Sequence, residues 1–541
     1  MSMTPKEIKS ALQKGKVALG VEFGSTTVKA ILTTEDFQTI ASGSYEWDNN
    51  FQDGLWTYAI SDVWLGLQTA YRNLKQKVED EYGVKINKIR TMGFSAMMHG
   101  YLAFDKEDTL LVPFRTWRNA ITGEAATELT KLFDFNIPQR WSVAHLYQAI
   151  LNQESHVKNI DFITTLAGYV HWQLTGKKVI GVGDASGMFP IDEQTSHYNQ
   201  EMMTKFSALK SVQQYQWQIE DILPKPLIAG QNAGNLTENG AHLLDPTGDL
   251  ESGSIIAPPE GDAGTGMVAT NSVKKRTGNI SVGTSIFSMI VLEKNLEHVY
   301  SNIDIVTTPT GLPVAMVHAN NSASDLNAWA KLFSEFAHKI GSDIATNKLY
   351  EVLFNAALNE AEPDAGGLTG YGYYSGENIT AIPEGRPLLV RQPDSKFTIG
   401  NLMRMHLFTA FGAIKIGMRI LADEQVLTDN IVAQGGVFKT PIVAQKLLAD
   451  ALNTDITVMQ TAGEGGPWGM ALLALFTANK AQNQSLDDFL ENSVFAEQQS
   501  ETLSPDKKDV AGFESFMKRY IDGLEIELAA VKNLPAKKGN E

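Results

Sequence analysis

Two short stretches of this sequence decide the fold. The first, GVEFGST, occupies residues 20–26, and the second, NISVGTS, occupies residues 279–285. Each is flanked on both sides by apolar residues with high β-propensity, so each predicts a strand, a tight Gly-Ser/Thr turn and a second strand. The chain shows no short solenoid period, so the echo indicates one duplication of a half rather than a repeat array.

Both turns have the composition of a phosphate-binding turn. Glycine lets the backbone approach a ligand closely, and the Ser or Thr that follows adds a hydroxyl donor to the converging amides. A single turn of this kind is more often an ordinary hairpin, but two copies in one frame favour a pair that holds a polyphosphate between two domains. The candidate phosphate-binding residues are Gly24, Ser25, Thr26, Lys29, Gly283, Thr284 and Ser285.

The bulk properties narrow the function. A length of 541 residues exceeds one hydrophobic core and favours two large domains. The formal net charge of -17 disfavours nucleic acids and anionic membranes as partners, and the absence of cysteine excludes thiolate catalysis and Cys-ligated zinc. We expect no signal peptide at the N-terminus, which lacks an apolar segment. The longest apolar run later in the chain, residues 470–476, is too short to span a bilayer. We therefore expect a soluble, cytoplasmic protein.

Strands alternate with helical patterns along the chain, which indicates an α/β architecture. A capping box at Thr4–Glu7 predicts a first short helix that Gly15 closes. Further expected helices are 58–82, 144–152, 163–174, 397–421, 441–453 and 513–531. Expected strands include 89–93, which runs into a loop at 95–100, and 431–433. Residues 255–262 are expected to form a strand that ends in a Pro/Gly loop, and 481–510 is expected to be loop. The expected domains are residues 1–266 and 267–490, followed by a C-terminal helix and tail at 491–541.

Asp262 is the candidate general base. It lies among glycines, in GDAGTG at residues 261–266, which would leave its carboxylate accessible. An enzyme that phosphorylates a hydroxyl group needs a carboxylate to orient that hydroxyl and accept its proton. A role as a helix N-cap explains the same residue equally well.

Other segments offer candidate contacts to a nucleotide and a sugar. Gly435 and Gly436 lie between a strand and a helical pattern, where a bare backbone could face an adenine ring, and Lys439 follows them. Met98 and His99 follow a predicted strand end, where α/β proteins usually place ligands. An aromatic face beside planar hydrogen-bonding groups, suited to a sugar, is offered by Trp117, Arg118 and Asn119. Each of these segments also has a plain structural explanation as a turn or a packed side chain.

Taken in order, these motifs resemble the FGGY carbohydrate kinase family of the actin-like ATPase superfamily, over residues 17–480. Residues 17–29 resemble its first phosphate motif, 279–285 the second, 261–262 its catalytic-base segment, and 431–449 with 463–471 its adenosine motif. Residues 373–377 resemble its Gly-Glu loop, 184–186 its Asp-x-Ser segment and 397–410 its second signature. The order and spacing of the set carry the resemblance.

The resemblance implies two ribonuclease-H-like α/β domains flanking a catalytic cleft, with ATP and Mg²⁺ as cofactors. It implies transfer of the γ-phosphate of ATP to the terminal primary hydroxyl of a ketopentose, L-ribulose or D-xylulose first, with Asp262 as the base. Glu22 stands where the family usually has Asp and is expected to act near Mg²⁺, directly or through water. Asn119 stands where sugar-binding relatives often have Asp, so the sugar itself stays open, and another ketose or a polyol is an alternative.

Two other functions fit part of the sequence. A non-kinase actin-like ATPase or sugar sensor would share the twin turns without needing Asp262 to face a hydroxyl. A dinucleotide-dependent oxidoreductase would use residues 181–187, where GVGDASG is a degraded glycine fingerprint that lacks its third glycine. The expected partners are a small-molecule sugar and ATP, and a homodimer is one possible assembly.

Overall fold

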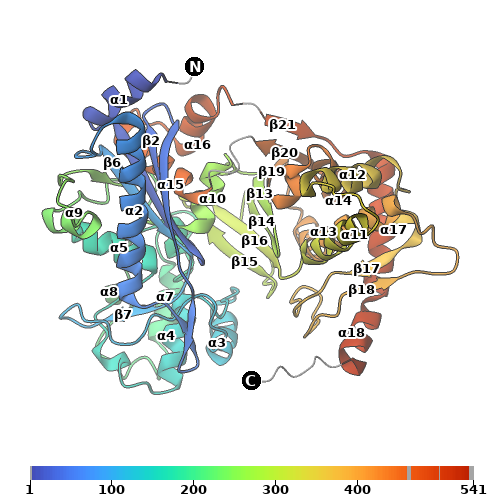
Figure 1. Ribbon diagram of the computed structural model, residues 1–541. Coiled ribbons are helices and arrows are strands. Elements are labelled where there is room, and N and C mark those ends of the chain that lie inside the picture. Colours follow the sequence, from blue (N-terminus) through green and yellow to red (C-terminus); the bar gives the residue numbers. More distant parts are fainter. Residues whose placement is uncertain (1–2, 460–464, 499, 535–541) are drawn as a thin grey trace. The chain divides into compact units, whose positions relative to one another are not determined.

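The computed structural model describes residues 3–459, 465–498 and 500–534 and divides into two compact units (Figure 1). The first unit comprises Met1–Val273, Asp304–Val314 and Glu464–Gln498, and the second comprises Lys274–Ile303, Ala315–Gly463 and Gln499–Glu541. The segment 464–498 therefore belongs with the N-terminal half. The domain boundary expected at residue 266 falls inside a helix, and the first unit continues to Val273.

The first unit is a mixed sheet covered by helices. Its elements are α1 (Pro5–Gln13), β1 (Val17–Phe23), β2 (Thr27–Thr34), β3 (Thr39–Glu46), β4 (Asn50–Gln52), β5 (Leu55–Thr57), α2 (Ile60–Tyr82), β6 (Thr91–Ala96), β7 (Leu102–Phe104), α3 (Gly123–Phe133), α4 (Ser142–Leu151), η1 (Val157–Asn159), β8 (Phe162–Thr164), α5 (Leu166–Thr175), β9 (Val179–Gly181), α6 (Val182–Ala185), α7 (Gln200–Ser207), α8 (Ile219–Ile222), β10 (Lys225–Leu227), α9 (Glu238–Leu244), β11 (Ile255–Ile256), β12 (Glu260–Gly261), α10 (Asp262–Ala269), α15 (Gly466–Asn479), α16 (Leu486–Phe489) and η5 (Leu490–Val494). The main sheet has the order β11-β6-β1-β2-β3, and β12 also pairs with β6. Strands β1 and β2 are antiparallel, whereas β6 is parallel to β1.

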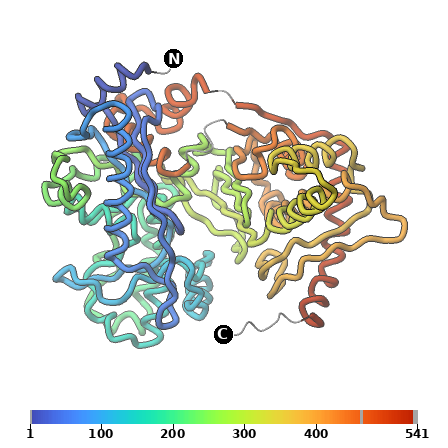
Figure 2. Tube along the Cα trace, viewed as in Figure 1, coloured from blue at the N-terminus to red at the C-terminus, as the bar shows by residue number. Residues whose placement is uncertain are grey.

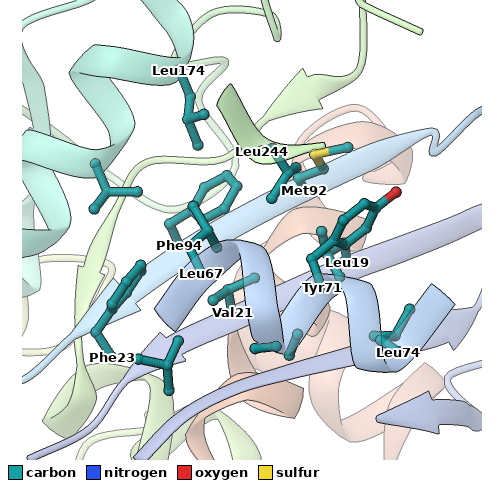
Figure 3. Packing of buried hydrophobic residues seen from close by; sticks show 14 of the residues in the cluster. Leu19, Val21, Phe23, Leu67, Tyr71, Leu74, Met92, Phe94, Leu174 and Leu244 are labelled. Carbon is teal, nitrogen blue, oxygen red and sulfur yellow. The ribbon is translucent and has the colours of Figure 1, made fainter. Parts of the chain in front are cut away.

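Successive side chains of β1 point to opposite faces of the sheet. Leu19, Val21 and Phe23 point to the face covered by α2, where they pack with Leu67 and other apolar side chains (Figure 3). The residues between them therefore point to the opposite face, which α15 covers. Although α15 comes late in the sequence, it lies beside the N-terminal strands (Figure 2). Glu22 is consequently on the α15 face of the sheet.

The second unit is also a mixed sheet with helices. Its elements, with β15 at the boundary between the units, are β13 (Thr277–Val282), β14 (Ile286–Val291), β15 (Ile303–Thr307), β16 (Pro313–Ala319), α11 (Ser324–Lys339), α12 (Thr346–Asn359), η2 (Ala365–Gly367), β17 (Thr369–Tyr371), β18 (Leu388–Val390), α13 (Ile399–Asp423), β19 (Asn430–Gly435), η3 (Gly436–Lys439), α14 (Val443–Leu452), β20 (Asp455–Met459), β21 (Ser500–Leu503), α17 (Lys507–Asp522) and α18 (Leu524–Asn533). Strand β13 pairs antiparallel with β14 and parallel with β19, which repeats the arrangement of β1 with β2 and β6. The duplication predicted from the two stretches is thus present in the fold.

Several expected elements differ from the observed ones. Residues 481–510 were expected to be loop, but they form α16, η5, β21 and the start of α17, because Leu486, Phe489 and Leu490 are buried. The single helix expected at 513–531 is two helices divided at Gly523. Strand β6 runs to Ala96, beyond the expected loop start at Ser95. The tail at 537–539 lies outside the described residues.

One helix in the described part of the chain, α13, is long and apolar enough to cross a membrane by length and composition. Its most apolar stretch is 72% buried within the structure. We therefore interpret α13 as a core helix of the second unit.

Candidate active site

Glu22 lies near the end of β1, half-buried on the face that α15 covers. In the sheet it is paired with Lys29 of β2 and Ser95 of β6. Its Oε2 accepts a hydrogen bond of 3.3 Å from the Thr265 hydroxyl in α10, and it lies so close to Gly466 that a Cβ there would be 1.6 Å away. The carboxylate is thus set between the first turns of α10 and α15.

The surroundings of Glu22 favour its protonated form. Burial and the neighbouring charge of Asp262 raise the pKa of Glu22 to about 8, although the Thr265 hydroxyl and the Lys29 ammonium oppose the shift. Two carboxyl groups that share a site cannot both ionise readily unless a cation joins them. This pair is therefore suited to a site that a positive charge completes.

Asp262 is the first residue of α10, and Gly261 takes the N-cap position. The interpretation of Asp262 as the N-cap itself is therefore wrong. Its Oδ1 accepts two backbone amide bonds, from Met98 at 3.1 Å and from Ala263 at 2.9 Å, while the side chain is exposed to solvent. Protein atoms that replace water around the carboxyl raise its pKa. The two amide bonds to Oδ1 fix the orientation of the carboxylate.

Met98 and His99 form the loop beside Asp262, after the end of β6. Both are buried, and His99 has a positive φ of 71°. Its Nδ1 donates to the Gly187 carbonyl at 3.4 Å, and its ring stacks on Trp141 at 6.3 Å. Burial, with a contribution from the Arg140 charge, holds the pKa of His99 well below its usual range, so its ring is neutral. The structure places the loop next to the carboxylate, and its contact with a sugar stays a prediction.

The first phosphate-type turn is held by aromatic side chains. Trp47 donates from Nε1 to the Gly24 carbonyl at 2.7 Å and from its backbone amide to the Thr26 carbonyl at 3.1 Å. Tyr58 donates from its hydroxyl to the Ser25 carbonyl at 2.6 Å, and the rings of Trp47 and Tyr58 stack at 4.3 Å. Since the amide and carbonyl of a trans peptide point in opposite directions, the amides after these three carbonyls point away from the aromatic pair.

The second turn is held by backbone amides instead of side chains. Ala323 donates to the Gly283 carbonyl at 3.0 Å, and Ser322 donates to the Thr284 carbonyl at 2.9 Å. The Gly283 amide closes the turn on the Ser285 carbonyl at 2.9 Å. Gly283 and Thr284 are exposed to solvent, so their backbone is within reach of an anion.

The three residues 117–119 separate in the structure. Trp117 is exposed and donates from Nε1 to the Ser25 hydroxyl at 3.2 Å, so it joins the first turn. Arg118 is exposed and its guanidinium lies 3.6 Å from the centre of the Trp56 ring. Asn119 is buried, and its amide group exchanges two 2.8 Å hydrogen bonds with the backbone of Trp56. Asn119 thus has a structural role that the sequence did not indicate.

The Gly-Gly turn after β19 presents a bare backbone. Gly435 has a φ of 124° and lies so close to the Val282 carbonyl that a Cβ would be 2.0 Å away, whereas a Cβ on Gly436 would meet open space. Lys439 is exposed at the end of η3. Next to this turn is a cavity of about 330 Å³, lined by Phe438, Thr440, Pro441, Ile442, Gln445, Val458, Met459, Ser500 and Glu501. The part of the expected adenosine motif at 463–464 lies outside the described residues.

Three residues of the site were not predicted from the sequence: Trp47, Tyr58 and Thr265. Trp47 and Tyr58 lie more than twenty residues after the turn they hold, and Thr265 lies on the same helix as Asp262. A hydroxyl three residues after Asp262 on the same helix could have been noticed, because residues at this spacing share a face. The aromatic contacts depend on the packing of β3 and the loop before α2, which no local pattern indicates.

The residues present fit a Mg²⁺ ion only in part. Within the described residues no group of three or more His, Cys, Asp or Glu side chains could hold a metal. Mg²⁺ in phosphoryl-transfer enzymes is commonly bound by one or two carboxylates together with water and substrate phosphates. Glu22, with its raised pKa and its neighbour Asp262, is a donor set of that kind.

Comparison with known proteins decides the family. The model of the FGGY family of carbohydrate kinases, N-terminal domain, matches residues 17–245, and that of its C-terminal domain matches residues 278–478. The chain belongs to the FGGY family of carbohydrate kinases. Its two mixed sheets have the two-domain, actin-like fold of these kinases.

Individual relatives of this FGGY kinase are distant. It is 21% identical over 525 residues to a xylulose kinase of Haemophilus influenzae, which covers 94% of this chain and 99% of the relative. It is 22% identical over 409 residues to a ribulokinase of Staphylococcus aureus, covering 72% and 68%. Among solved structures, a ligand-bound xylulose kinase from Lactobacillus acidophilus matches with a TM-score of 0.74 at 16% identity, covering 96% and 99%. The structural match establishes the fold. Sequence identities this low do not establish the substrate, which has to be inferred from the site.

Proposed function

We propose that this FGGY kinase transfers the γ-phosphate of ATP to the terminal primary hydroxyl of a ketopentose, with L-ribulose and D-xylulose as the first candidates. The observation that carries the proposal is the geometry of Asp262. Its Oδ1 is fixed by the amides of Met98 and Ala263, and its carboxylate is open to solvent beside the Met98-His99 loop. A carboxylate held in this way can orient a hydroxyl group and take its proton.

The proposed reaction is a direct in-line displacement. The sugar oxygen forms a bond to the γ-phosphorus while the bond from that phosphorus to the leaving oxygen of ADP breaks, and the hydroxyl proton passes to Asp262. The amides and hydroxyls of the turns at Gly24–Thr26 and Gly283–Ser285 bind the phosphates. A bound Mg²⁺ would offset negative charge on the phosphates, and Glu22 is the residue of this chain that would hold it.

The nucleotide side of the proposal rests on the second unit. The exposed Gly435-Gly436 backbone and the adjacent cavity offer a flat surface and apolar walls, which suit a purine ring. Lys439 is exposed on the same segment and offers a positive charge to a phosphate. A cytoplasmic location, a homodimer and the choice between the two pentoses stay predictions.

The test is sugar-dependent release of ADP across a panel of ketopentoses, aldopentoses and polyols. The proposal expects the largest value of kcat/KM for L-ribulose or D-xylulose and little ADP release without a sugar. ADP release at the same rate with and without every sugar would instead identify a non-kinase ATPase. A best substrate among the aldopentoses or polyols would support a sugar kinase and rule out a ketopentose as its preferred substrate.

A further inference from the structure

Two buried carboxyl groups, those of Asp184 and Glu260, lie directly behind Asp262 and have no part in binding the substrates proposed above. Asp184 is in the one-turn helix α6, and Glu260 begins β12, two residues before Asp262. Each residue is only 1% exposed, so neither carboxyl can reach a ligand in the site. We call this pair the carboxyl clasp.

The carboxyl clasp joins two segments of the chain. Glu260 accepts a hydrogen bond of 3.1 Å at Oε2 from the backbone amide of Asp184. Asp184 Oδ2 accepts from the Thr165 hydroxyl at 2.6 Å, and its Oδ1 lies 3.4 Å from the position that a Cβ on Gly261 would take. Glu260 is therefore bonded to the segment that carries Asp184, Asp184 packs beside Gly261, and the segment of Glu260 and Gly261 continues into Asp262.

Gly181 and Gly183, of the GVGDASG segment, have no side chain and so leave room for the carboxyl of Glu260. A Cβ on Gly181 would lie 2.3 Å from Glu260 Oε1, and a Cβ on Gly183 would lie 2.4 Å from Glu260 Oε2. A side chain at either position would expel the carboxyl of Glu260. The space that a dinucleotide would need beside these glycines is thus filled by the protein's own carboxyl group, which opposes the oxidoreductase interpretation.

The clasp is unfavourable for stability. Asp184 Oδ1 and Glu260 Oε1 are buried without a hydrogen-bond partner among the described residues. Burial, and then the neighbouring charge of Asp262, raises the pKa of Asp184 to about 7, and burial and the charge of Asp184 hold the pKa of Glu260 well above its usual range. The titratable groups that interact with Asp184 are Glu260 and Tyr198, together with Asp262, on which Arg140 also acts. An apolar pair of similar size would stabilise this position more, so a stability role does not account for the clasp.

We propose that Asp184 and Glu260 are positioning residues for Asp262, because they hold the backbone from which the Asp262 side chain extends. This inference rests on the proposed function. Glu260 is bonded to the Asp184 amide, Asp184 lies beside Gly261, and Gly261 is the N-cap at which the chain passes from β12 into α10.

The test compares truncated and neutral variants in the full chain. Asp184→Ala and Glu260→Ala free the backbone at Gly261, so kcat should fall about 10- to 100-fold while the KM for ATP stays unchanged, since a misplacement near 1 Å can have an effect of this size. Asp184→Asn and Glu260→Gln imitate the protonated groups and should keep kcat within about threefold of the wild type. If the neutral variants keep kcat while the truncated ones lose it, the clasp acts by holding the backbone and needs no negative charge.

Glu527 supplies a matched control in the second unit. Its carboxyl is buried, it accepts from the Arg386 amide at 2.6 Å, its Oε2 lacks a partner among the described residues, and burial raises its pKa to about 7. Because a raised pKa in the folded state means that stability is lost as pH rises from about 4 through about 7, Asp184→Asn and Glu527→Gln should both raise Tm at pH 8 relative to the wild type. Only the truncation at Asp184 or Glu260, and not Glu527→Ala, should lower kcat.

Asp262→Asn is measured beside these variants to separate the two hypotheses. If Asp262→Asn is inactive while Asp184→Ala and Glu260→Ala keep the kcat of the wild type, the inference about the clasp is overturned and the proposed function stands. If Asp262→Asn turns over normally, Asp262 is not the base, and the role proposed for it fails together with the inference about the clasp. A loss of kcat in Glu527→Ala equal to that in Glu260→Ala would also overturn the inference, because the effect would then follow from general destabilisation.

Discussion

The two hairpin turns have similar sequences and are held by different means. In the first, the side chains of Trp47 and Tyr58 donate to the carbonyls of Gly24 and Ser25, and the backbone amide of Trp47 donates to the carbonyl of Thr26. In the second, the carbonyls of Gly283 and Thr284 are bound by the backbone amides of residues 322–323, at the start of α11. The shared result is a turn whose carbonyls are all occupied on one side, so that its amides are presented on the other.

The difference shows which part of each turn the local sequence determines. Gly-Ser/Thr supplies the backbone freedom and the hydroxyl, while the direction of the peptide groups is set by partners outside the turn. The turns also differ in what precedes them: Glu22 stands in the first at the position that Ser281 occupies in the second. Glu22 also lies close to Asp262. In the proposed reaction the first unit supplies the base and the metal-binding carboxyl, and both turns bind phosphate.

The largest expected effect is at Asp262, the proposed base in the first unit. Asp262→Asn should lower kcat by about 10²- to 10⁴-fold, because the amide cannot accept the hydroxyl proton. The dissociation constant for ATP, measured by calorimetry, should stay within about twofold of the wild type, because the turns that bind phosphate are untouched. Near-normal turnover would remove Asp262 from the reaction.

The next effect tests the inequality of the two turns directly. Glu22→Gln should weaken the dependence of turnover on Mg²⁺ and lower kcat about tenfold or more, because a neutral amide binds the ion poorly. Ser281→Ala, the matched change at the second turn, should leave the Mg²⁺ titration of turnover unchanged. Equal effects of the two substitutions would mean that the turns are equivalent and that Glu22 has no special role.

A smaller effect on KM and stability is expected at Tyr58, whose hydroxyl holds the first turn. Tyr58→Phe removes the 2.6 Å hydrogen bond to the Ser25 carbonyl but keeps the ring stacked on Trp47. The loss should destabilise the protein by about 1 kcal/mol in chemical denaturation and raise the KM for ATP a few-fold. Tyr82→Phe, an aromatic change at the far end of α2, serves as the control and should alter neither KM nor kcat. A wild-type KM in Tyr58→Phe would show that the turn keeps its shape without this hydrogen bond.

The smallest effects are expected at Gly435 and Gly436, and the two glycines should respond differently to substitution by alanine. Gly436→Ala should leave Tm unchanged, since a Cβ there meets open space, and should raise the KM for ATP if the backbone faces the adenine ring. Gly435→Ala should lower stability by about 1 kcal/mol or more, because of its positive φ and the Val282 carbonyl 2.0 Å from the new Cβ. An unchanged KM in Gly436→Ala would place the adenine elsewhere.

Much of this fold is encoded in local pattern. The Gly-Ser/Thr hairpins, the capping box of α1 and the long apolar helix α13 were predicted because their signals are contiguous in sequence. The site was predicted less completely. Glu22 and Asp262 were found from their neighbours, but Trp47, Tyr58 and Thr265 reach them only through tertiary packing.

Other misses have the same physical origin. The pattern of residues 481–510 is polar overall, yet a few apolar side chains are buried and order α16 and η5. The glycines at 181 and 183 resemble part of a nucleotide fingerprint. In the structure they make room for Glu260, which comes nearly eighty residues later in the sequence. Contacts between distant segments decide such roles, and one sequence does not reveal them.

The most direct test of the central claim is to identify where the γ-phosphate of ATP goes. Phosphorus NMR of the wild-type reaction with L-ribulose or D-xylulose should show ADP together with an equal amount of a phosphomonoester whose signal is split by the two protons of a terminal CH₂ group. The Asp262→Asn variant should show neither product at a comparable enzyme concentration. Inorganic phosphate in place of the sugar phosphate would contradict the account, because it would mean that the γ-phosphate is transferred to water.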